Sequence, residues 1–332
     1  MYTDSSPTAC ATMPTMPAVP VVSRMPRPSL AAQAPEPTRL TVAADDGVGL
    51  YVEVEGSEDT EITVVFCHGL ALSQDCWRFQ RAAFAHRARL VFYDQRGHGR
   101  SDRGAQGSAT IEQLGRDLYR VLAETAPEGP VVLVGHSMGG MTIMALAETH
   151  PDLFLDRVVG VGLLSSSAGG LDRLTLGLPL HAAGALYPVL SGVLKVLRGR
   201  GRIGDYGRRA TGDLIRMLVG RPSVLGLAAG MISATAIEAF ADFYPTLAEH
   251  DRLAALAALQ AMPSVVMVGA DDLLTPAEHS TAICAALPPA ELVVLPETGH
   301  NLVLERPYEV TAYLGRLLTK AENHWKTLRR AA

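Results

Sequence analysis

The chain has 332 residues, which is enough for one large α/β domain or two smaller ones, and one domain with an insertion fits this length best. Hydrophobic residues make up 48% of the chain and charged residues 19%, so there is ample material for a core, and a chain that is disordered throughout is excluded. The net charge of -5 gives no overall signal for nucleic acid, and we expect no DNA or RNA partner.

Residues 1–37 form a compositional region of their own, with eight prolines among Ser, Thr and Ala. Prolines at this spacing prevent helices and sheet ladders, and the segment has too few large apolar residues for a core. We predict a flexible tail, whose composition also suits the recruitment of a partner domain. Because it lacks a basic start followed by a continuous apolar run, it is a poor signal peptide, with a cryptic export signal as the alternative.

The four cysteines show neither a C-x-x-C pair nor a zinc-like grouping. They are Cys10, Cys67, Cys76 and Cys284. Cys67 lies in an apolar, strand-like run, and we interpret all four as reduced thiols of a cytoplasmic protein.

Apolar strands alternate with helices from residue 39 to residue 164. Residues 39–43 and 50–55 are predicted to form a β-hairpin around the Asp-Gly turn of Asp45-Asp46-Gly47. The strands expected after this hairpin are residues 62–66, 90–93, 131–134 and 158–164, and the expected helices are residues 77–84, 111–125 and 141–150. This alternation predicts a parallel sheet that helices cover on both faces.

The pattern changes between residues 168 and 250, where only helical periodicity is found, and we predict a helical insertion there. Its expected helices are residues 174–197, 213–218 and 224–243. The sheet then resumes with strands 265–268 and 292–295, a helix over 277–287 between them, and a terminal helix from Pro307. The predicted organisation is a tail (1–37), a core in two parts (38–167 and 251–332) and the insertion (168–250).

Gly135-His136-Ser137-Met138-Gly139 joins a buried strand to a helix. Glycines have no Cβ, so they let the backbone bend sharply and bring strand and helix together. Ser137 is thereby presented at the carboxyl end of the strand, which is the arrangement of the G-x-S-x-G nucleophile elbow. The alternative is a Gly-Ser turn before an ordinary helix, and the strand, turn and helix context argues against it.

A serine hydroxyl is a weak nucleophile at neutral pH, so Ser137 needs a base within hydrogen-bond reach and an acid that orients the base. Asp272 and His300 each follow a predicted strand directly, which makes them the candidates. For His300 the alternative is a histidine of a surface loop. Asp271 competes with Asp272, and chemistry alone does not separate two adjacent aspartates. Asp117 is a weaker rival, because it falls within a predicted helix.

Five motifs, in this order, resemble those of the α/β-hydrolase fold superfamily: His68-Gly69, Asp94-Gln95-Arg96-Gly97-His98-Gly99-Arg100-Ser101, Gly135-His136-Ser137-Met138-Gly139-Gly140, Gly269-x-x-Asp272 with Thr275-Pro276, and Gly299-His300. The resemblance extends from about Arg39 to the C-terminal helix. It implies an α/β fold with a mostly parallel central sheet, helices on both faces and a helical cap inserted after the strand that ends near Leu164. It also implies that Ser137 is the nucleophile and His300 the general base and then acid. The family's G-x-x-D spacing selects Asp272 as the orienting carboxylate.

Acyl transfer places negative charge on the former carbonyl oxygen, so the site needs hydrogen-bond donors aimed at that oxygen. The resemblance implies that these are the backbone N–H groups of Leu70 and Met138, which would form the oxyanion hole. We interpret His68 as a brace of its loop rather than a base. Structural bonds to the neighbouring loop, with a direct chemical role as the alternative, are expected for Asp94, Arg96 and His98.

The first part of the insertion is strongly apolar. The resemblance implies that such a cap shapes the acyl or leaving-group pocket, and apolar linings suit lipophilic ligands. Packing of the cap onto the core explains any single residue equally well. A membrane span over residues 174–197 is opposed by Pro179, His181, Pro188 and Lys195. The basic stretch beside it fits a solvated connector or, as the less favoured alternative, a transient contact with a lipid surface: Lys195, Arg198, Arg200, Arg202, Arg208 and Arg209.

The function expected from the resemblance is a soluble serine hydrolase that cleaves a carboxylic ester with a hydrophobic acyl or alcohol part through an acyl-enzyme, as a carboxylesterase or small lipase does. The serine at the elbow excludes the haloalkane dehalogenases and epoxide hydrolases of this fold, which carry aspartate there. A lactonase, a thioesterase, a perhydrolase of the cofactor-free haloperoxidase type and a C–C bond hydrolase of the meta-cleavage type use the same triad. A ligand-binding or receptor protein with little turnover is the alternative from another class. The scattered histidines show no ligand spacing, so we expect no metal and no cofactor.

Overall fold

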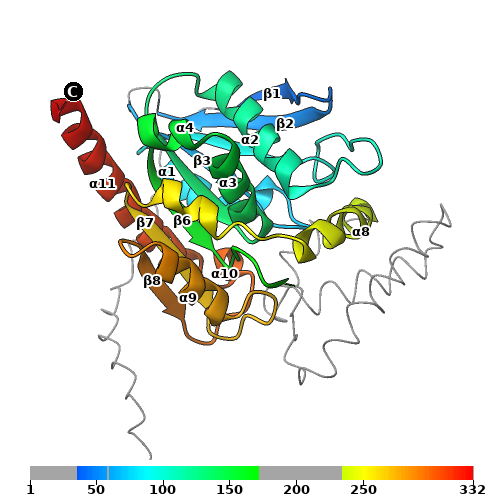
Figure 1. Ribbon diagram of the computed structural model, residues 1–332. Coiled ribbons are helices and arrows are strands. Elements are labelled where there is room, and N and C mark those ends of the chain that lie inside the picture. Colours follow the sequence, from blue (N-terminus) through cyan, green and yellow to red (C-terminus); the bar gives the residue numbers. More distant parts are fainter. Residues whose placement is uncertain (1–35, 58–59, 172–233, 332) are drawn as a thin grey trace, which may run out of the picture. The chain divides into compact units, whose positions relative to one another are not determined.

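The computed structural model describes residues 36–57, 60–171 and 234–331 (Figure 1). The chain divides into the units Met1–Ala34 and Pro35–Ala332, and the described residues all belong to the second unit. The predicted tail of residues 1–37 therefore lies outside the described residues, except for its last two positions.

An eight-stranded sheet forms the centre of the described unit, in the order β1-β2-β4-β3-β5-β6-β7-β8. Its strands are β1 (Thr38–Ala43), β2 (Gly49–Gly56), β3 (Thr63–Cys67), β4 (Arg89–Tyr93), β5 (Val131–His136), β6 (Val158–Leu164), β7 (Ser264–Gly269) and β8 (Glu291–Leu295). The hairpin of β1 and β2 is antiparallel, as is the pairing of β2 with β4. Every pairing from β4 to β8 is parallel, so the predicted, mostly parallel sheet is confirmed.

Helices cover both faces of this sheet (Figure 1). One face is covered by α2 (Ile111–Thr125), α3 (Met138–Thr149), α4 (Pro151–Asp156), α9 (Ala277–Ala286) and the 3-10 turn η3 (Ala254–Leu259). The other face is covered by the 3-10 turn η1 (Gln74–Trp77), α1 (Arg78–Phe84), α10 (Leu302–Glu305) and α11 (Pro307–Ala331).

Strand β5 shows why the sheet is apolar on both sides. Val131 and Leu133 pack into the cluster under α2 and α3, whereas Val132 and Val134 pack into the cluster under α11. Successive side chains of a strand point to opposite faces, so a strand between two helical layers is mainly apolar on both faces. All residues of β3, β5, β6 and β7 are buried, which places the functional loops at the ends of a rigid core.

The predicted elements of the core are present, with two differences. Helix α3 begins at Met138, directly after the elbow, three residues earlier than the predicted start at residue 141. Four short elements were not predicted, namely η1, α4, α10 and η3. The reason is visible at Pro151, which was expected to end a helix but begins α4, because proline is well suited to the first turn of a helix.

Most of the predicted insertion lies outside the described residues, including the predicted helices 174–197 and 213–218 and the basic stretch from Lys195 to Arg209. Its last part forms α8 (Ala234–Ala248), which overlaps the predicted helix 224–243. The two ends of the segment lie side by side, since Gly169 and Asp251 form an antiparallel bridge and the Arg252 N–H donates to the Ala168 carbonyl at 2.7 Å. The domain boundaries stay a prediction.

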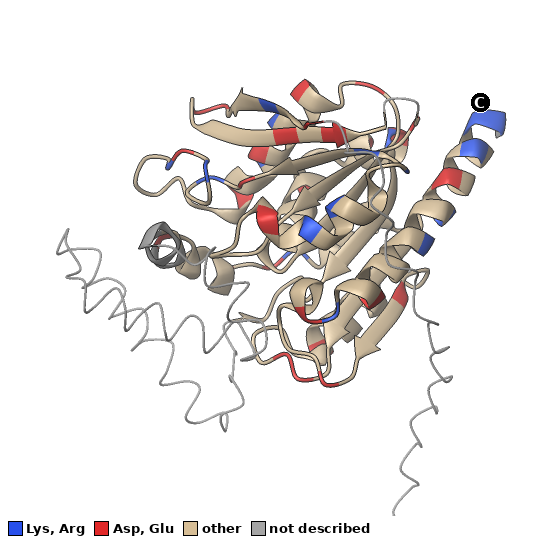
Figure 2. Cartoon of the chain, turned by 180° about the vertical axis from the view of Figure 1, so that it is seen from behind, with Lys and Arg blue, Asp and Glu red and all other residues tan. Residues whose placement is uncertain are grey.

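Charged residues of both signs are interspersed over the described elements, and the last turn of α11 is basic (Figure 2). Within the described ranges, no helix is long and apolar enough to cross a membrane.

Candidate active site

Ser137 stands at the junction between β5 and α3, in a strained backbone conformation. Its φ is 53° and its ψ is -120°, a region that non-glycine residues rarely occupy. Its N–H donates to the Leu164 carbonyl at the end of the neighbouring strand β6, at 2.8 Å. The surrounding strands therefore hold the serine in a conformation that presents its half-buried side chain beyond the sheet edge.

The two glycines of the elbow are required by close backbone approach. A Cβ on Gly139 would lie 2.1 Å from the Cys67 carbonyl oxygen, and a Cβ on Gly135 would lie 2.5 Å from the backbone of Gly139. Any side chain at either position would push α3 away from the ends of β3 and β5. The predicted tight packing of strand and helix is thus confirmed.

Three residues that are far apart in the sequence form one series of hydrogen bonds. His300 Nε2 lies 2.9 Å from Ser137 Oγ, and His300 Nδ1 lies 2.9 Å from Asp272 Oδ2. Because the carboxylate only accepts, Nδ1 carries the proton, which leaves Nε2 free to accept the proton of the serine. The structure therefore brings Ser137, His300 and Asp272 together with the polarity that activation of a serine requires.

Asp272 follows β7 and is almost completely buried. Besides His300, it accepts hydrogen bonds from the N–H groups of Leu274 and Thr275 and from the Thr275 hydroxyl, at 2.9, 3.0 and 2.9 Å. Burial raises its pKa, but the charge and hydrogen bond of His300 and the bond from Thr275 outweigh burial and lower the pKa to about 2. The carboxylate is therefore ionised at neutral pH.

The rival aspartates lie elsewhere. Asp271 is exposed, and its backbone N–H donates to the Thr298 carbonyl at 2.8 Å. Asp117 is buried on α2 and pairs with Arg96. Among these three carboxylates, the one that meets the imidazole of His300 is Asp272.

His136, immediately before Ser137, contacts the backbone of His300. Its Nε2 lies 2.9 Å from the His300 carbonyl oxygen, so it donates there, and the two rings are 5.1 Å apart. Burial, followed by the nearby His300, lowers the pKa of His136 to about 3, so it is neutral at pH 7. This bond ties the loop that carries the imidazole to the end of β5.

The candidate oxyanion donors adjoin Ser137 from two directions. Met138 follows it in the chain as the first residue of α3, and Leu70 follows Gly69, where a Cβ would lie 3.1 Å from that of Ser137. The first N–H groups of a helix have no partner within the helix, so that of Met138 is available to a ligand. In the described parts of the chain, neither N–H takes part in a hydrogen bond to another protein group.

The carbonyl of each donor peptide is held from the opposite side. The Gly69 carbonyl accepts from His68 Nδ1 at 2.8 Å, and the Ser137 carbonyl accepts from the Ser166 hydroxyl at 2.8 Å. In a trans peptide the carbonyl and the next N–H point in opposite directions, so a fixed carbonyl fixes the direction of the N–H. His68 thus has the geometry of the brace that was predicted. Burial lowers its pKa to about 4, so it is neutral at pH 7.

The motif after β4 holds its own loop together. Both carboxylate oxygens of Asp94 accept backbone N–H groups, those of Gln74 at 2.8 Å and Arg100 at 2.9 Å. Gly99 has a φ of 53°, and a Cβ there would lie 2.3 Å from the Asp94 carboxylate, so only glycine fits. His98 is buried, and its Nδ1 lies 2.9 Å from the Arg96 carbonyl oxygen.

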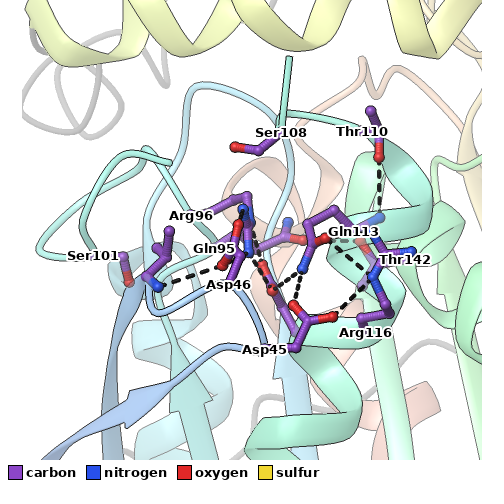
Figure 3. Close-up of polar contacts among 12 residues, drawn as sticks. Asp45, Asp46, Gln95, Arg96, Ser101, Ser108, Thr110, Gln113, Arg116 and Thr142 are labelled. Atoms are coloured by element: carbon purple, nitrogen blue, oxygen red, sulfur yellow. Dashed lines mark hydrogen bonds and ion pairs between the residues drawn. The ribbon is translucent and has the colours of Figure 1, made fainter. Parts of the chain in front are cut away.

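Arg96 is buried at the centre of a charged cluster that extends from the buried Asp117 to the exposed Asp46 (Figure 3). Its guanidinium binds both oxygens of Asp117 at 2.6 Å and both oxygens of Asp46 at 2.7 and 3.0 Å. Burial raises the pKa of Asp117, yet we take the pair as ionised, because the guanidinium keeps its proton and its two bonds stabilise the anion. Gln113 donates to Asp117 at 3.1 Å and to Asp45 at 2.6 Å. These contacts have the geometry of the structural bonds predicted for this motif.

An apolar cluster adjoins both candidate oxyanion donors. Leu70 and Met138 share it with Phe243 and Leu247 of α8 and with Leu171, at the start of the predicted insertion. The Phe243 ring also lies 5.6 Å from that of His98, so α8 contacts the loops at this sheet edge. Apolar side chains beside polar reacting groups are typical of pockets for lipophilic ligands.

Five residues with direct contacts to the site were missed or given no role by sequence reasoning: Gln95, His136, Thr142, Ser166 and, as a ligand of the Asp272 carboxylate, Thr275. Only Thr275 has a local signal, since an aspartate side chain commonly accepts from groups of the turn that follows it. The other four act across the sheet edge, where chain distance gives no indication. In the described residues, no group of three or more His, Cys, Asp or Glu side chains is arranged to hold a metal ion.

A strained serine after a buried parallel strand, hydrogen-bonded through histidine to aspartate from later strands, defines the class of α/β hydrolases. The chain belongs to the Alpha/beta hydrolase family, whose model matches residues 64–312. It is 30% identical over 262 residues to a protein of Caulobacter sp. (strain K31) named "Putative carbamate hydrolase RutD", covering 78% of this chain and 91% of that relative.

Solved structures agree with this fold. A thermophilic esterase from Thermogutta terrifontis superposes with a TM-score of 0.68 and 25% identity, covering 86% of this chain and 99% of that one. The enol-lactonase from Burkholderia xenovorans LB400 superposes with a TM-score of 0.69 and 24% identity, covering 84% and 100%. The predicted fold is thus confirmed by an independent comparison of structures.

Proposed function

We propose that this protein is a serine hydrolase that cleaves a carboxylic ester with a hydrophobic acyl or alcohol part through an acyl-enzyme. The observation that carries the proposal is the continuous series Ser137 Oγ, His300 and Asp272, with 2.9 Å at each step. The proposed roles are nucleophile for Ser137, general base and then acid for His300, and orienting carboxylate for Asp272.

In the first half of the reaction, Ser137 Oγ bonds to the ester carbonyl carbon while its proton moves to His300 Nε2. The carbonyl electron pair moves onto the oxygen, which the N–H groups of Leu70 and Met138 stabilise as the proposed oxyanion hole. Asp272 stabilises the imidazolium that forms. The tetrahedral intermediate then expels the alcohol, which takes the proton from His300 and leaves the acyl group on Ser137.

In the second half, water attacks the acyl carbon and gives a proton to His300 Nε2. The second tetrahedral intermediate uses the same two N–H donors. Its collapse releases the carboxylic acid, and the proton returns from His300 to Ser137 Oγ. The free enzyme is restored without any metal or redox step.

A hydrophobic substrate is supported by the apolar cluster of Leu70, Met138, Leu171, Phe243 and Leu247 beside the proposed oxyanion hole. An ester is supported by the likeness to the Thermogutta terrifontis esterase. The name of the Caulobacter relative adds carbamates to the substrates worth testing. Lactones, thioesters, peracids and C–C substrates use the same triad and belong in the same panel.

The proposed setting is the cytoplasm. Cys67, Cys76 and Cys284, the cysteines within the described residues, are free thiols. Free thiols favour a reducing compartment.

The test combines labelling and turnover. A fluorophosphonate probe should label the wild-type protein, and p-nitrophenyl esters of increasing chain length should be hydrolysed, with a preference for longer acyl chains. Ser137→Ala should abolish labelling and lower kcat by roughly 10⁴- to 10⁶-fold, because the nucleophile is lost. Ser280→Ala, which removes another buried serine hydroxyl on α9, is the matched control and should be labelled like the wild type. An unlabelled wild-type protein that binds esters without turnover would instead identify a ligand-binding protein.

A further inference from the structure

The two proposed oxyanion donors belong to segments that are far apart in the chain. Leu70 lies in the loop after β3, and Met138 is the first residue of α3. A single substrate oxygen receives both hydrogen bonds only if the distance and angle between the two N–H groups are fixed before the reaction. Contacts between the loop and the helix must therefore fix their relative position and orientation.

The two backbones already touch at one point. Gly139 packs so closely against the Cys67 carbonyl that no Cβ fits between them. One point of contact fixes a distance but leaves the loop free to rotate about it. A second contact is needed to fix the angle of the peptide that carries the Leu70 N–H.

Gln95 supplies a second contact. Its side chain is fully buried, its Nε2 donates to the His68 carbonyl at 2.5 Å, and its Oε1 accepts from the Thr142 hydroxyl at 2.8 Å. His68 begins the loop that carries Leu70, whereas Thr142 lies one turn after Met138 on α3. One amide group thus spans the gap between the two donor segments.

The orientation of this amide has only one good solution. If Oε1 and Nε2 were exchanged, Oε1 would face the His68 carbonyl, and two acceptors would meet in a buried place. The Thr142 hydroxyl also lies 2.9 Å from the Met138 carbonyl oxygen, so the same hydroxyl contacts the first turn of α3 and the bridging amide. Each end of Gln95 is therefore bonded to a segment that bears one of the donors.

The backbone of Gln95 acts on the same loop. Its N–H donates to His68 Nε2 at 2.9 Å, which places the ring proton on Nδ1. That Nδ1 donates at 2.8 Å to the Gly69 carbonyl, which belongs to the peptide whose N–H is that of Leu70. The residue after Asp94 is thus connected to the Leu70 peptide through both its main chain and its side chain.

We propose that Gln95 is a positioning residue that, with Thr142, sets the spacing and angle of the Leu70 and Met138 N–H groups. This inference rests on the proposed function. Gln95 does not touch the reacting atoms, and its effect is exerted through the two segments that it joins. The consequence is that its loss weakens binding of the transition state more than binding of the substrate.

The variants are chosen to separate positioning from folding. Gln95→Met keeps the length of the side chain and the backbone N–H bond to His68 but removes the bridge. Thr142→Val removes the hydroxyl at nearly constant shape, and Thr142→Ser, its matched control, retains it. Each variant is compared with the wild type for kcat, KM, the inhibition constant of a trifluoromethyl ketone analogue of the best ester, the pH profile and the melting temperature.

Complete loss of one oxyanion donor lowers the rate roughly 10²- to 10³-fold, and a misplaced donor retains part of its effect. We therefore expect kcat of Gln95→Met to fall about 10- to 50-fold, with KM within about twofold of the wild-type value. The inhibition constant of the trifluoromethyl ketone, whose hydrate or adduct oxygen occupies the oxyanion position, should rise by the same factor. The kcat of Thr142→Val should fall about three- to tenfold, and the kcat of Thr142→Ser should stay within about twofold of the wild-type value. The midpoint of the pH profile should not move, because Asp272 and His300 are untouched.

Gln95→Met or Thr142→Val with a lowered melting temperature but unchanged kcat and inhibition constant would overturn the inference and leave only a structural role. A loss of kcat that comes with a shifted pH profile and an unchanged inhibition constant would also overturn it, since Gln95 would then act through His300. If Gln95→Met does not fold, the Thr142 pair decides alone. Failure of the proposed function itself appears separately, as a wild-type protein that the fluorophosphonate does not label.

Discussion

Two groups of hydrogen-bonded side chains lie at the same edge of the sheet, and they differ in the partner of their buried carboxylate. One is the series Asp272, His300 and Ser137, and the other is the pair of Asp117 with Arg96. Both include a carboxylate that is almost completely removed from water. Arg96 donates to Asp117 at 2.6 Å and His300 donates to Asp272 at 2.9 Å, and these hydrogen bonds favour the charged form of each carboxylate.

The difference lies in the partner of the carboxylate. The imidazole of His300 contacts Asp272 through Nδ1 and the Ser137 hydroxyl through Nε2, and the backbone of Ser137 is strained. The Nε2 atom of His300 has a lone pair that can accept the serine proton. The guanidinium of Arg96 keeps its proton, and Asp46 and Asp117 occupy it on two sides. The first arrangement can move a proton, whereas the second can only hold two segments together.

The largest expected effect is the difference in kcat between a substitution of Asp272, the carboxylate of the first group, and one of its neighbour Asp271. Asp272→Asn keeps the shape but removes the charge and favours the wrong tautomer of His300, so kcat should fall about 10³- to 10⁴-fold. Asp271→Asn, one residue away, should stay within about twofold of the wild type. Steady-state kinetics on the best p-nitrophenyl ester measures both. Equal losses in the two variants would contradict the assignment of Asp272.

The second largest effect is expected in the other group, Arg96 and Asp117, and it concerns the free energy of unfolding instead of the rate. Arg96→Met leaves Asp117 buried without its partner, which should lower the free energy of unfolding by about 3 to 5 kcal/mol. Catalysis per folded molecule should change less than threefold, because the cluster does not touch the triad. Urea unfolding measures the free energy of unfolding. Active-site titration gives the concentration of active protein, from which catalysis per folded molecule is calculated. The double variant Arg96→Met with Asp117→Leu should recover part of the stability, and an unaltered unfolding midpoint in the single variant would refute the structural role.

The sequence predicted which three residues meet in the first group but not the contacts that support them, for a physical reason. Ser137 is indicated in the sequence by glycines two residues before it and two residues after it, because a tight local backbone conformation requires particular local residues. Strands β3, β5, β6 and β7 are likewise visible as apolar runs, because burial on both faces excludes polar residues.

The supporting contacts join residues that no local pattern connects. Gln95 and Thr142 are 47 positions apart, and His136 lies 164 positions from the carbonyl that it holds. Glutamine, threonine and histidine occur at many positions for many reasons, and only the folded sheet edge reveals which of them meet. Asp272 and Asp271 were separated by family spacing alone, because the choice depends on which carboxylate turns inward.

A smaller expected effect is the pH dependence of stability at His98, whose Nδ1 contacts the Arg96 carbonyl. Burial, and then the neighbouring His68, lowers the pKa of His98 to about 3, below its ordinary value of 6.5. Below pH 6.5, His98 therefore binds a proton in the unfolded chain but not in the folded chain. The contribution of His98 to stability is present above pH 6.5 and is lost as the pH falls from 6.5 toward 3. At one pH unit below 6.5 the loss amounts to roughly 1 kcal/mol.

His98→Phe removes this titration while keeping an aromatic ring beside Phe243, whose ring lies 5.6 Å away. Between pH 7.5 and pH 5.5, the unfolding free energy of the variant should fall by roughly 1 kcal/mol less than that of the wild type. His86→Gln, at an exposed histidine, is the control and should follow the wild type. Parallel curves for wild type and His98→Phe would show that His98 does not resist protonation in the folded protein.

The smallest effect lies on the catalytic side, at Ser166. Its hydroxyl donates to the Ser137 carbonyl at 2.8 Å, the carbonyl of the peptide whose N–H is that of Met138. That carbonyl also accepts the Gly140 N–H at 2.9 Å, so the start of α3 already orients it and Ser166 only adds to this. One neutral hydrogen bond contributes about 1 kcal/mol, so Ser166→Ala should lower kcat about three- to tenfold at constant KM.

The control for Ser166→Ala is again Ser280→Ala, which removes a buried hydroxyl that has no hydrogen-bond partner among the described residues. If both alanine variants lose kcat equally, the loss reflects removal of a buried hydroxyl and not the Ser137 peptide. If Ser166→Ala alone loses kcat, and affinity for the trifluoromethyl ketone falls in proportion, the carbonyl side of the Met138 peptide contributes to catalysis. The surroundings of Ser137 would then differ from the Arg96 cluster in a second respect. Their hydrogen bonds would fix the direction of the Met138 N–H in addition to stabilising the fold.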